Sequence, residues 1–181
     1  MRPIFTIHAG EYLVATRIEE SFPELRIWIP SSDTGIDLLV TDSHQNKVAS
    51  LQVKFSKDYL GTKQTSSLKS EIISGGWWTL NRRKMATSAA DVWVFVLYQF
   101  HSKRFDFVVI PPGELLHRYD QIGVRTNPIQ TYFSVTKRGQ CWETRGLSKD
   151  ESLMVNCGKY DNPNRDFTKY LNVWPFRAAG A

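Results

Sequence analysis

The sequence predicts one domain of the α/β or α+β class, in which helices flank a mixed β-sheet. A length of 181 residues fits a single domain, since domains typically hold about 100–200 residues. A hydrophobic share of 41% is enough for a folded core. Helical and strand-like patterns alternate along the chain and end in a smaller β/α stretch. We therefore expect one domain over residues 1–181, with its core over about 5–125 and a C-terminal extension over about 126–181.

The first half of the chain carries one helical pattern followed by three strand-like patterns. Tyr12, Ala15 and Ile18 recur at helical spacing, and Pro23 ends that pattern. The turn-rich residues 42–46 join two strand patterns, which predicts a β-hairpin. From these patterns we expect a helix over 8–22, strands over 25–29, 36–40 and 48–55, and a loop over 59–70.

The second half begins with Gly75-Gly76, which we expect to break the chain before a second helix. Alternating apolar residues beyond that helix predict paired strands, and a proline-rich start predicts a short helix. Residues 137–139 suit the turn of a last hairpin, and Asp150 and Glu151 suit a helix N-terminus. The expected elements are a helix over 79–90, strands over 92–100 and 105–110, a helix over 111–119, strands over 130–136 and 140–144, and a helix over 164–173.

Composition excludes several classes of protein. No apolar run approaches the roughly 18–20 residues of a membrane-spanning helix, and the N-terminus lacks the apolar stretch of a secretory signal. The two cysteines, Cys141 and Cys157, form no CxxC motif, and the four histidines lack metal-ligand spacing. This pattern argues against a disulfide scaffold or a zinc site, although a single disulfide between the two cysteines stays open. We expect a protein of the reducing cytoplasm without a membrane partner.

One segment of the chain carries the whole excess of positive charge. The formal net charge is +5, and between residues 54 and 84 seven basic residues accompany two acids, Asp58 and Glu71, which again leaves five. We interpret this segment as a surface that binds the phosphate backbone of a nucleic acid. The alternative is that its charges lie on a solvated loop and helix face. The Trp77-Trp78 pair inside the segment suits either base stacking or core packing. The expected nucleic-acid-binding residues are Lys57, Lys63, Lys69, Arg82, Arg83 and Lys84.

Four polar residues, Glu11, Asp37, Gln52 and Lys54, occupy positions where the pattern of a buried core expects apolar ones. Gln52 and Lys54 are two apart in one strand, so they share a sheet face, and the hairpin brings Asp37 alongside. Carboxylate and carbonyl oxygens are the ligands that Mg²⁺ prefers. We therefore expect Mg²⁺ or Mn²⁺, and no organic cofactor, held by the oxygens of Glu11, Asp37, Gln52 and the Val53 backbone. Metal-assisted phosphodiester hydrolysis fits this set, with Lys54 as a cation that holds the attacking water or the scissile phosphate.

The same residues carry a resemblance to a known family. The relevant segments, in order, are Gly10-Glu11-Tyr12-Leu13-Val14-Ala15, Asp33-Thr34-Gly35-Ile36-Asp37 and Gln52-Val53-Lys54. Together they resemble the PD-(D/E)XK nuclease superfamily, in the branch written Glu…Gly-x-Asp…Gln-x-Lys that includes restriction-type and prokaryotic mobile-element nucleases. The resemblance covers residues 8–56 and implies a restriction-endonuclease-like core, with Glu11, Asp37 and Gln52 in the metal site and Lys54 as the catalytic lysine. Two departures are the amide of Gln52 in place of an acid and the lack of a proline directly before Asp37.

The residues and the resemblance together predict a metal-dependent endonuclease that hydrolyses DNA phosphodiester bonds in a prokaryotic-type intracellular setting. Cutting both strands requires two sites, which suits a homodimer. The amide of Gln52 keeps a second interpretation open, namely a catalytically inactive module of the same fold that binds nucleic acid or a partner protein. A third interpretation is a protein-interaction domain with no affinity for polyanions. The target sequence and the choice between DNA and RNA stay open as well.

Overall fold

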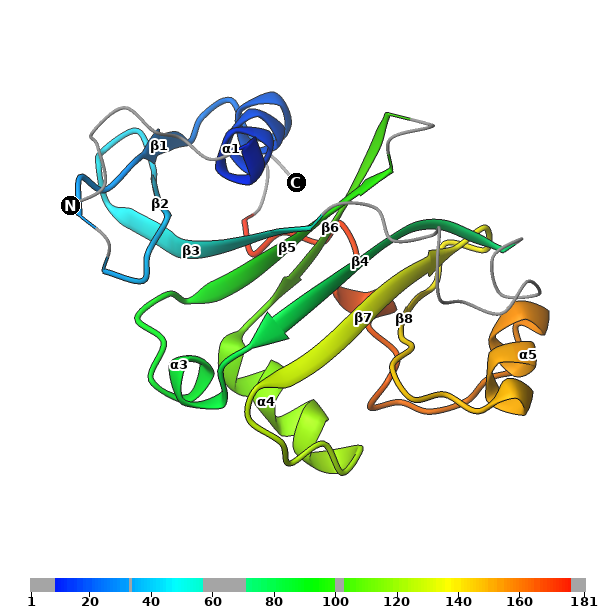
Figure 1. Cartoon of the computed structure of the whole chain (residues 1–181). Helices are drawn as coiled ribbons and strands as arrows, with labels where there is room; N and C mark the ends of the chain where they lie inside the picture. The colour runs from blue at the N-terminus through cyan, green and yellow to red at the C-terminus, as the bar shows by residue number, and fades with distance from the viewer. Residues whose placement is uncertain (1–8, 33, 57–70, 100–102, 177–181) are drawn as a thin grey trace.

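The computed structural model describes residues 9–32, 34–56, 71–99 and 103–176 (Figure 1). The predicted loop over 59–70 lies outside this part of the chain, as do Asp33, Lys57, Lys63 and Lys69. The helices are α1 (Ala9–Ser21), α3 (Arg82–Ala86), α4 (Pro112–Gln121), α5 (Lys149–Cys157) and the 3-10 helix η1 (Thr168–Tyr170). The strands are β1 (Arg26–Trp28), β2 (Leu38–Thr41), β3 (Lys47–Ser56), β4 (Ile72–Leu80), β5 (Val92–Gln99), β6 (Arg104–Ile110), β7 (Ile129–Thr136) and β8 (Cys141–Glu143).

The strands form a five-stranded sheet in the order β1-β2-β3-β5-β6 and a three-stranded sheet in the order β4-β7-β8. In the larger sheet β3 pairs antiparallel with β2 and parallel with β5, which confirms the predicted mixed sheet flanked by helices. The predicted hairpin is β2–β3. Its turn is held by the carboxylate of Asp42, which accepts hydrogen bonds from the backbone N–H groups of His44 and Asn46 (both 2.9 Å).

Each face of the five-stranded sheet buries a different core, and Figure 1 shows the elements that cover the two faces. Helix α1 covers one face, where Ile18 packs with Leu51 of β3. The three-stranded sheet covers the other face, where aromatic rings meet edge to face. The ring of Phe95 lies 5.0 Å from that of Trp78 and 5.1 Å from that of Phe133. Strands β3 and β5 are therefore held between two packed layers.

The prediction that Gly75-Gly76 breaks the chain is wrong, because both glycines lie inside β4. The ring of Trp78 folds over Gly76, and a Cβ built at Gly76 would overlap the indole. The glycine therefore makes room for the indole that fills the core between the two sheets. Strand β4 then pairs antiparallel with β7 over nearly its whole length.

The predicted helix over 79–90 is shorter in the structure, where α3 covers only Arg82–Ala86. Leu80 is buried as the last residue of β4. Asn81 then caps the helix, because its side chain accepts a hydrogen bond from the backbone N–H of Lys84 (3.0 Å). The buried end of the strand and this cap together set where the helix begins.

The C-terminal part of the chain adds to the aromatic core instead of forming a separate body. The predicted last hairpin is confirmed as β7 and β8. The predicted helix over 164–173 is wrong, because that stretch holds only η1 and is tied to β6 by a bridge between Val108 and Leu171. The longer helix in this part is α5, which holds the predicted acidic pair, Asp150 and Glu151, in its first turn. Ser148 and Glu151 form its capping box.

We predict that Gly76→Ala destabilises the protein by about 1–3 kcal/mol, because the new Cβ would overlap the buried indole of Trp78. Gly113→Ala is the matched control. Apart from its own helix and chain neighbours, no group lies within 4 Å of a Cβ at Gly113, which sits in the first turn of α4, so alanine should leave stability unchanged or slightly higher. Chemical unfolding of the two variants beside the wild type measures both effects. Equal unfolding midpoints for all three proteins would contradict the packing argument.

A buried ion pair links the C-terminal part of the chain to the three-stranded sheet. The carboxylate of Glu143 is 1% exposed and pairs with the guanidinium of Arg165. It also accepts hydrogen bonds from the hydroxyl of Thr131 (3.2 Å) and the backbone N–H of Arg145 (3.1 Å). Burial raises the pKa of Glu143 to about 7, although Arg165 and the hydrogen bonds oppose that rise.

We predict that this carboxyl makes the folded protein less stable as the pH rises from 4.5, the ordinary pKa of Glu143, to about 7. In that range the unfolded chain has released the proton while the folded protein still holds it, so the free energy of unfolding falls. Glu143→Gln removes the titrating group and should flatten this part of the curve. Urea unfolding of both proteins across the same pH range provides the measurement, and two parallel curves would refute the prediction.

Candidate functional site

The candidate site lies where β2 begins and its partner β3 runs on past it. The pairing of the two strands stops at Leu38 opposite Leu51, whereas β3 runs on to Ser56. Within the described ranges, no strand pairs with β3 on the β2 side beyond Leu51. This leaves a gap in the sheet that side chains from both faces of β3 can reach.

Asp37 closes the end of the hairpin at this gap. Its backbone N–H continues the ladder by donating to the carbonyl of Leu51 (2.8 Å), and its carboxylate accepts a hydrogen bond from the backbone N–H of Val53 (2.8 Å). Gly35, with φ at 82°, supplies the turn that leads into this position. Asp37 is only 8% exposed, so its carboxylate is fixed by the protein. Because the N–H and C=O of one strand residue face the same edge, the Val53 carbonyl also faces the gap.

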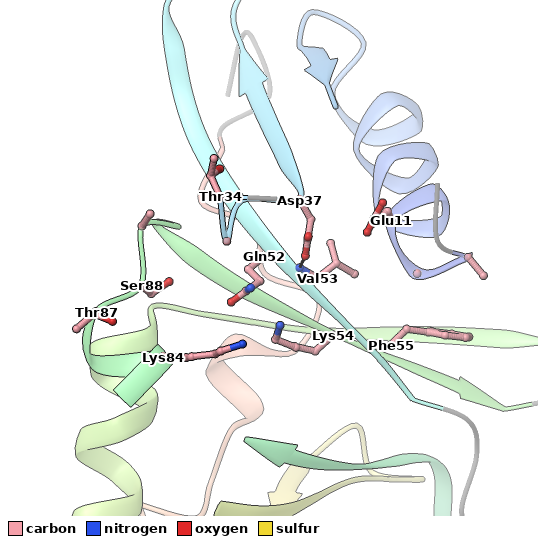
Figure 2. A pocket seen from close by; sticks show the side chains of 14 residues that line it. Glu11, Thr34, Asp37, Gln52, Val53, Lys54, Phe55, Lys84, Thr87 and Ser88 are labelled. Atoms are coloured by element: carbon pink, nitrogen blue, oxygen red, sulfur yellow. Dashed lines mark hydrogen bonds between the residues drawn. The ribbon is translucent and has the colours of Figure 1, made fainter. Parts of the chain in front are cut away.

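Glu11 reaches the gap from α1. The helix approaches β3 closely because Gly10 has no side chain, and a Cβ there would lie 2.6 Å from the Cβ of Phe55. Glu11 follows in the first turn of α1, where the helix dipole favours a carboxylate, and it is 4% exposed. The helix therefore brings a second buried acid to the gap, which Asp37 reaches from the turn before β2 (Figure 2).

Gln52 and Lys54 extend from the face of β3 that is turned away from α1. The parallel pairing with β5 places Gln52 beside Trp93 and Lys54 beside Phe95. The ammonium of Lys54 lies 5.0 Å from the centre of the Trp93 ring. Val53, between the two polar residues, packs on the α1 side. The alternation predicted from the sequence is thus present in the strand.

A single cavity of about 920 Å³ joins these groups. All five predicted chemical residues line it, namely Glu11, Asp37, Gln52, Val53 and Lys54 (Figure 2). Lys84 of α3 lines the same cavity, and its amine points into the space that Lys54 also faces. The charges are therefore separated, with two buried carboxylates on one side, two lysines on the other and the amide of Gln52 between them.

The remaining predicted nucleic-acid residues differ in their surroundings. Arg82 is bonded to α4 and the loop after it, through the carboxylate of Asp120 (2.6 Å) and the carbonyl of Val124. Arg83 is exposed on α3. Of the basic residues in α3, Lys84 is therefore the one that reaches the cavity, while Arg82 anchors the short helix that carries it.

The Trp77-Trp78 pair divides between the two faces of β4. Trp78 is 6% exposed and packs against Phe95 and Phe133, so for this residue the core-packing alternative is confirmed. Trp77 lies on the other face, where its ring is 6.3 Å from that of Tyr132. Neither tryptophan lines the cavity.

Several cavity residues carry no recognisable signal in the sequence. Thr87 and Ser88 line the cavity from the segment between α3 and β5, and Thr34 lines it from the turn before Asp37. The hydroxyl of Thr87 donates to the carbonyl of Arg83 (3.0 Å), and that of Ser88 accepts from the indole N–H of Trp93 (2.9 Å). The place of Ser88 follows from the folding of the segment after α3 against β5, which no local pattern reveals.

The donor set of the cavity suits a hard divalent cation. It offers two carboxylates, one amide carbonyl and the Val53 carbonyl, all of them oxygen donors of the kind that Mg²⁺ binds. In the described part of the chain, no group of three histidines, cysteines, aspartates or glutamates comes together as a metal site. The candidate set therefore depends on the amide of Gln52 as its third side-chain ligand. With two carboxylates it carries less negative charge than a set of three acids would.

Three further findings bear on the identity of the chain. Cys141 and Cys157 are both free thiols, the first buried and the second exposed. No helix of the described residues is long and apolar enough to cross a membrane. No protein-family model, no curated protein and no solved structure matches this chain.

Proposed function

We propose that this protein is a metal-dependent endonuclease of the PD-(D/E)XK type that hydrolyses phosphodiester bonds of DNA. One observation supports the proposal above all: two buried carboxylates, an amide and two lysines line a single cavity at the open edge of β3. The chain gathers these groups from α1, the turn before β2, β3 and α3. Carboxylates on one side and lysines on the other suit a divalent cation beside a phosphate.

The oxygen donors of Glu11, Asp37, Gln52 and Val53 would hold Mg²⁺ or Mn²⁺. When bound, such an ion neutralises charge on the phosphate and makes a water molecule more acidic. The chain prepares these donors in advance. The backbone N–H of Val53 fixes the carboxylate of Asp37 at 2.8 Å, and burial in the first turn of α1 limits the motion of Glu11. Positioned groups of this kind reduce the rearrangement that the reaction requires.

Lys54 and Lys84 would act on the substrate. Hydrolysis adds water to phosphorus and breaks one P–O ester bond, and negative charge builds up on the phosphate oxygens. The ammonium of Lys54, beside Gln52 on β3, would stabilise that charge. Lys84 on the facing wall would hold a neighbouring phosphate, and the exposed Arg83 would extend the cationic surface along the strand. Cleavage of both DNA strands would require a second copy of the chain.

A second candidate function is a catalytically inactive module of the same fold that binds nucleic acid or a partner protein. Gln52 favours it, because an amide brings no negative charge and leaves the cavity with two carboxylates. Such a module would keep the lysines, and therefore its affinity for DNA, while holding a cation weakly. Cleavage and binding assays on the same protein separate the two functions.

We predict that the protein nicks or linearises supercoiled plasmid in Mg²⁺ or Mn²⁺ and that EDTA abolishes this activity. Lys54→Ala should lower kcat by about 100-fold or more, because the transition state loses one charged partner. Lys159→Ala is the control, since it removes an exposed lysine that follows α5 and does not line the cavity. It should cleave like the wild type.

Calorimetry with Mn²⁺ completes this test. Asp37→Ala should weaken the affinity for the ion, because a buried oxygen donor is lost. Unchanged metal affinity in Asp37→Ala, together with full activity in Lys54→Ala, would overturn the nuclease proposal. A gel shift with no cleavage by the wild type in either metal would support the inactive module instead.

We predict that Lys84→Ala weakens binding of a labelled DNA duplex uniformly across sequences. The slope of log affinity against log salt should also fall by about 1, since one phosphate contact is lost. Fluorescence anisotropy in EDTA at several salt concentrations measures both effects without cleavage, and Lys159→Ala again serves as the control. An unchanged salt slope in Lys84→Ala would show that this lysine does not contact the backbone.

A further inference from the structure

The ammonium of Lys54 is held over an aromatic face. Trp93 lies on β5 next to Gln52 in the parallel ladder, and its ring centre is 5.0 Å from Nζ of Lys54. A cation at this distance over an indole is attracted by the negative face of the ring. Trp93 is itself only 2% exposed and does not line the cavity, so it offers almost no surface to a substrate.

The indole of Trp93 is in turn fixed by the wall of the cavity. Its N–H donates a hydrogen bond to the hydroxyl of Ser88 (2.9 Å), and the same hydroxyl accepts from the backbone N–H of Ala90 (3.2 Å). The indole also packs beside Phe95, with ring centres 6.3 Å apart. A ring held by a hydrogen bond and by packing has one orientation, so the cation above it has a defined place.

We propose that Trp93 is a positioning residue, which holds the ammonium of Lys54 in the cavity and is itself oriented by Ser88. This inference rests on the proposed function for its catalytic consequence. Lysine has a long side chain with many rotamers, and a reaction that needs its charge at one point loses rate when the charge is spread over several positions. The indole face limits those positions without touching the reacting atoms.

Three substitutions separate positioning from simple packing. Trp93→Leu removes the aromatic face, whereas Trp93→Phe keeps an aromatic face and removes the N–H that bonds Ser88. Trp142→Leu is the matched control, because Trp142 is 3% exposed and packs in a different cluster with Ile72 and Val155. Loss of a large buried side chain should destabilise both leucine variants to a similar degree.

The direct test is the NMR signal of the lysine ε-methylene in metal-free protein with ¹³C-labelled lysine. The signal of Lys54 is assigned by its disappearance in Lys54→Arg, and we expect it to be shifted upfield by the ring current of Trp93. The shift should vanish in Trp93→Leu, persist in reduced form in Trp93→Phe and stay unchanged in Trp142→Leu. In cleavage assays Trp93→Leu should lower kcat about tenfold with KM unchanged, and Trp93→Phe should recover most of that loss.

An unshifted Lys54 signal in the wild type, or an unchanged shift in Trp93→Leu, would overturn the proposal. So would an equal loss of kcat in Trp93→Leu and Trp142→Leu, since that would indicate general destabilisation. If Trp93→Leu does not fold, Trp93→Phe and Ser88→Ala decide the matter, and an unchanged Lys54 signal in both would refute the proposal. If the Lys54 signal is shifted and responds to these variants, the contact with Trp93 is supported. If the same protein never cleaves DNA, the proposed function is refuted although the contact remains.

Discussion

The hydrogen bond from the backbone N–H of Val53 to the carboxylate of Asp37 governs the arrangement of the whole site. This hydrogen bond takes the place of the backbone bond that a longer β2 would have made to β3. The pairing of the two strands therefore stops here without leaving the N–H of Val53 unpaired. A hydrogen bond to a charged group contributes about 1.5–3 kcal/mol. If β2 continued instead, a strand would fill the space that the cavity occupies. One side chain therefore ends the hairpin and begins the site.

The three-stranded sheet contributes no residue to the lining of the cavity, but it positions α3, which carries Lys84. Its first strand, β4, is fixed by the indole of Trp78 folded over Gly76, and it delivers the chain directly to α3. That helix has only five residues, too few to be stable alone. The ion pair between Arg82 and Asp120 (2.6 Å) and the cap at Asn81 hold it in place. Packing far from the carboxylates thus determines where Lys84 lies.

The sequence predicts the strands of the five-stranded sheet and the meeting of Asp37, Gln52 and Lys54 at one cavity, because both depend on local patterns, while the chemical roles of these residues stay predictions. Alternation in β3 separates Lys54 from Val53, and the turn after β2 sets the hairpin that brings Asp37 alongside. The glycines of β4 were misleading, because Gly76 is required by a neighbouring ring and not by a turn. The contribution of Ser88 could not be predicted either. Its bond to Trp93 forms only when the segment after α3 folds against β5.

The open edge of β3 has a consequence beyond chemistry. A strand edge with exposed backbone groups is a template for pairing with another chain, which leads to aggregation. Here the edge is short, because it covers only the part of β3 beyond Leu51, and the hydroxyl of Ser56 at its far end accepts a hydrogen bond from the backbone N–H of Trp77 in β4 (3.1 Å). The ionic side chains beside it, Glu11 and Lys54, disfavour the approach of a second strand. The side chains proposed for catalysis thereby also disfavour strand pairing at this edge, and a chain without these charges would lose that protection.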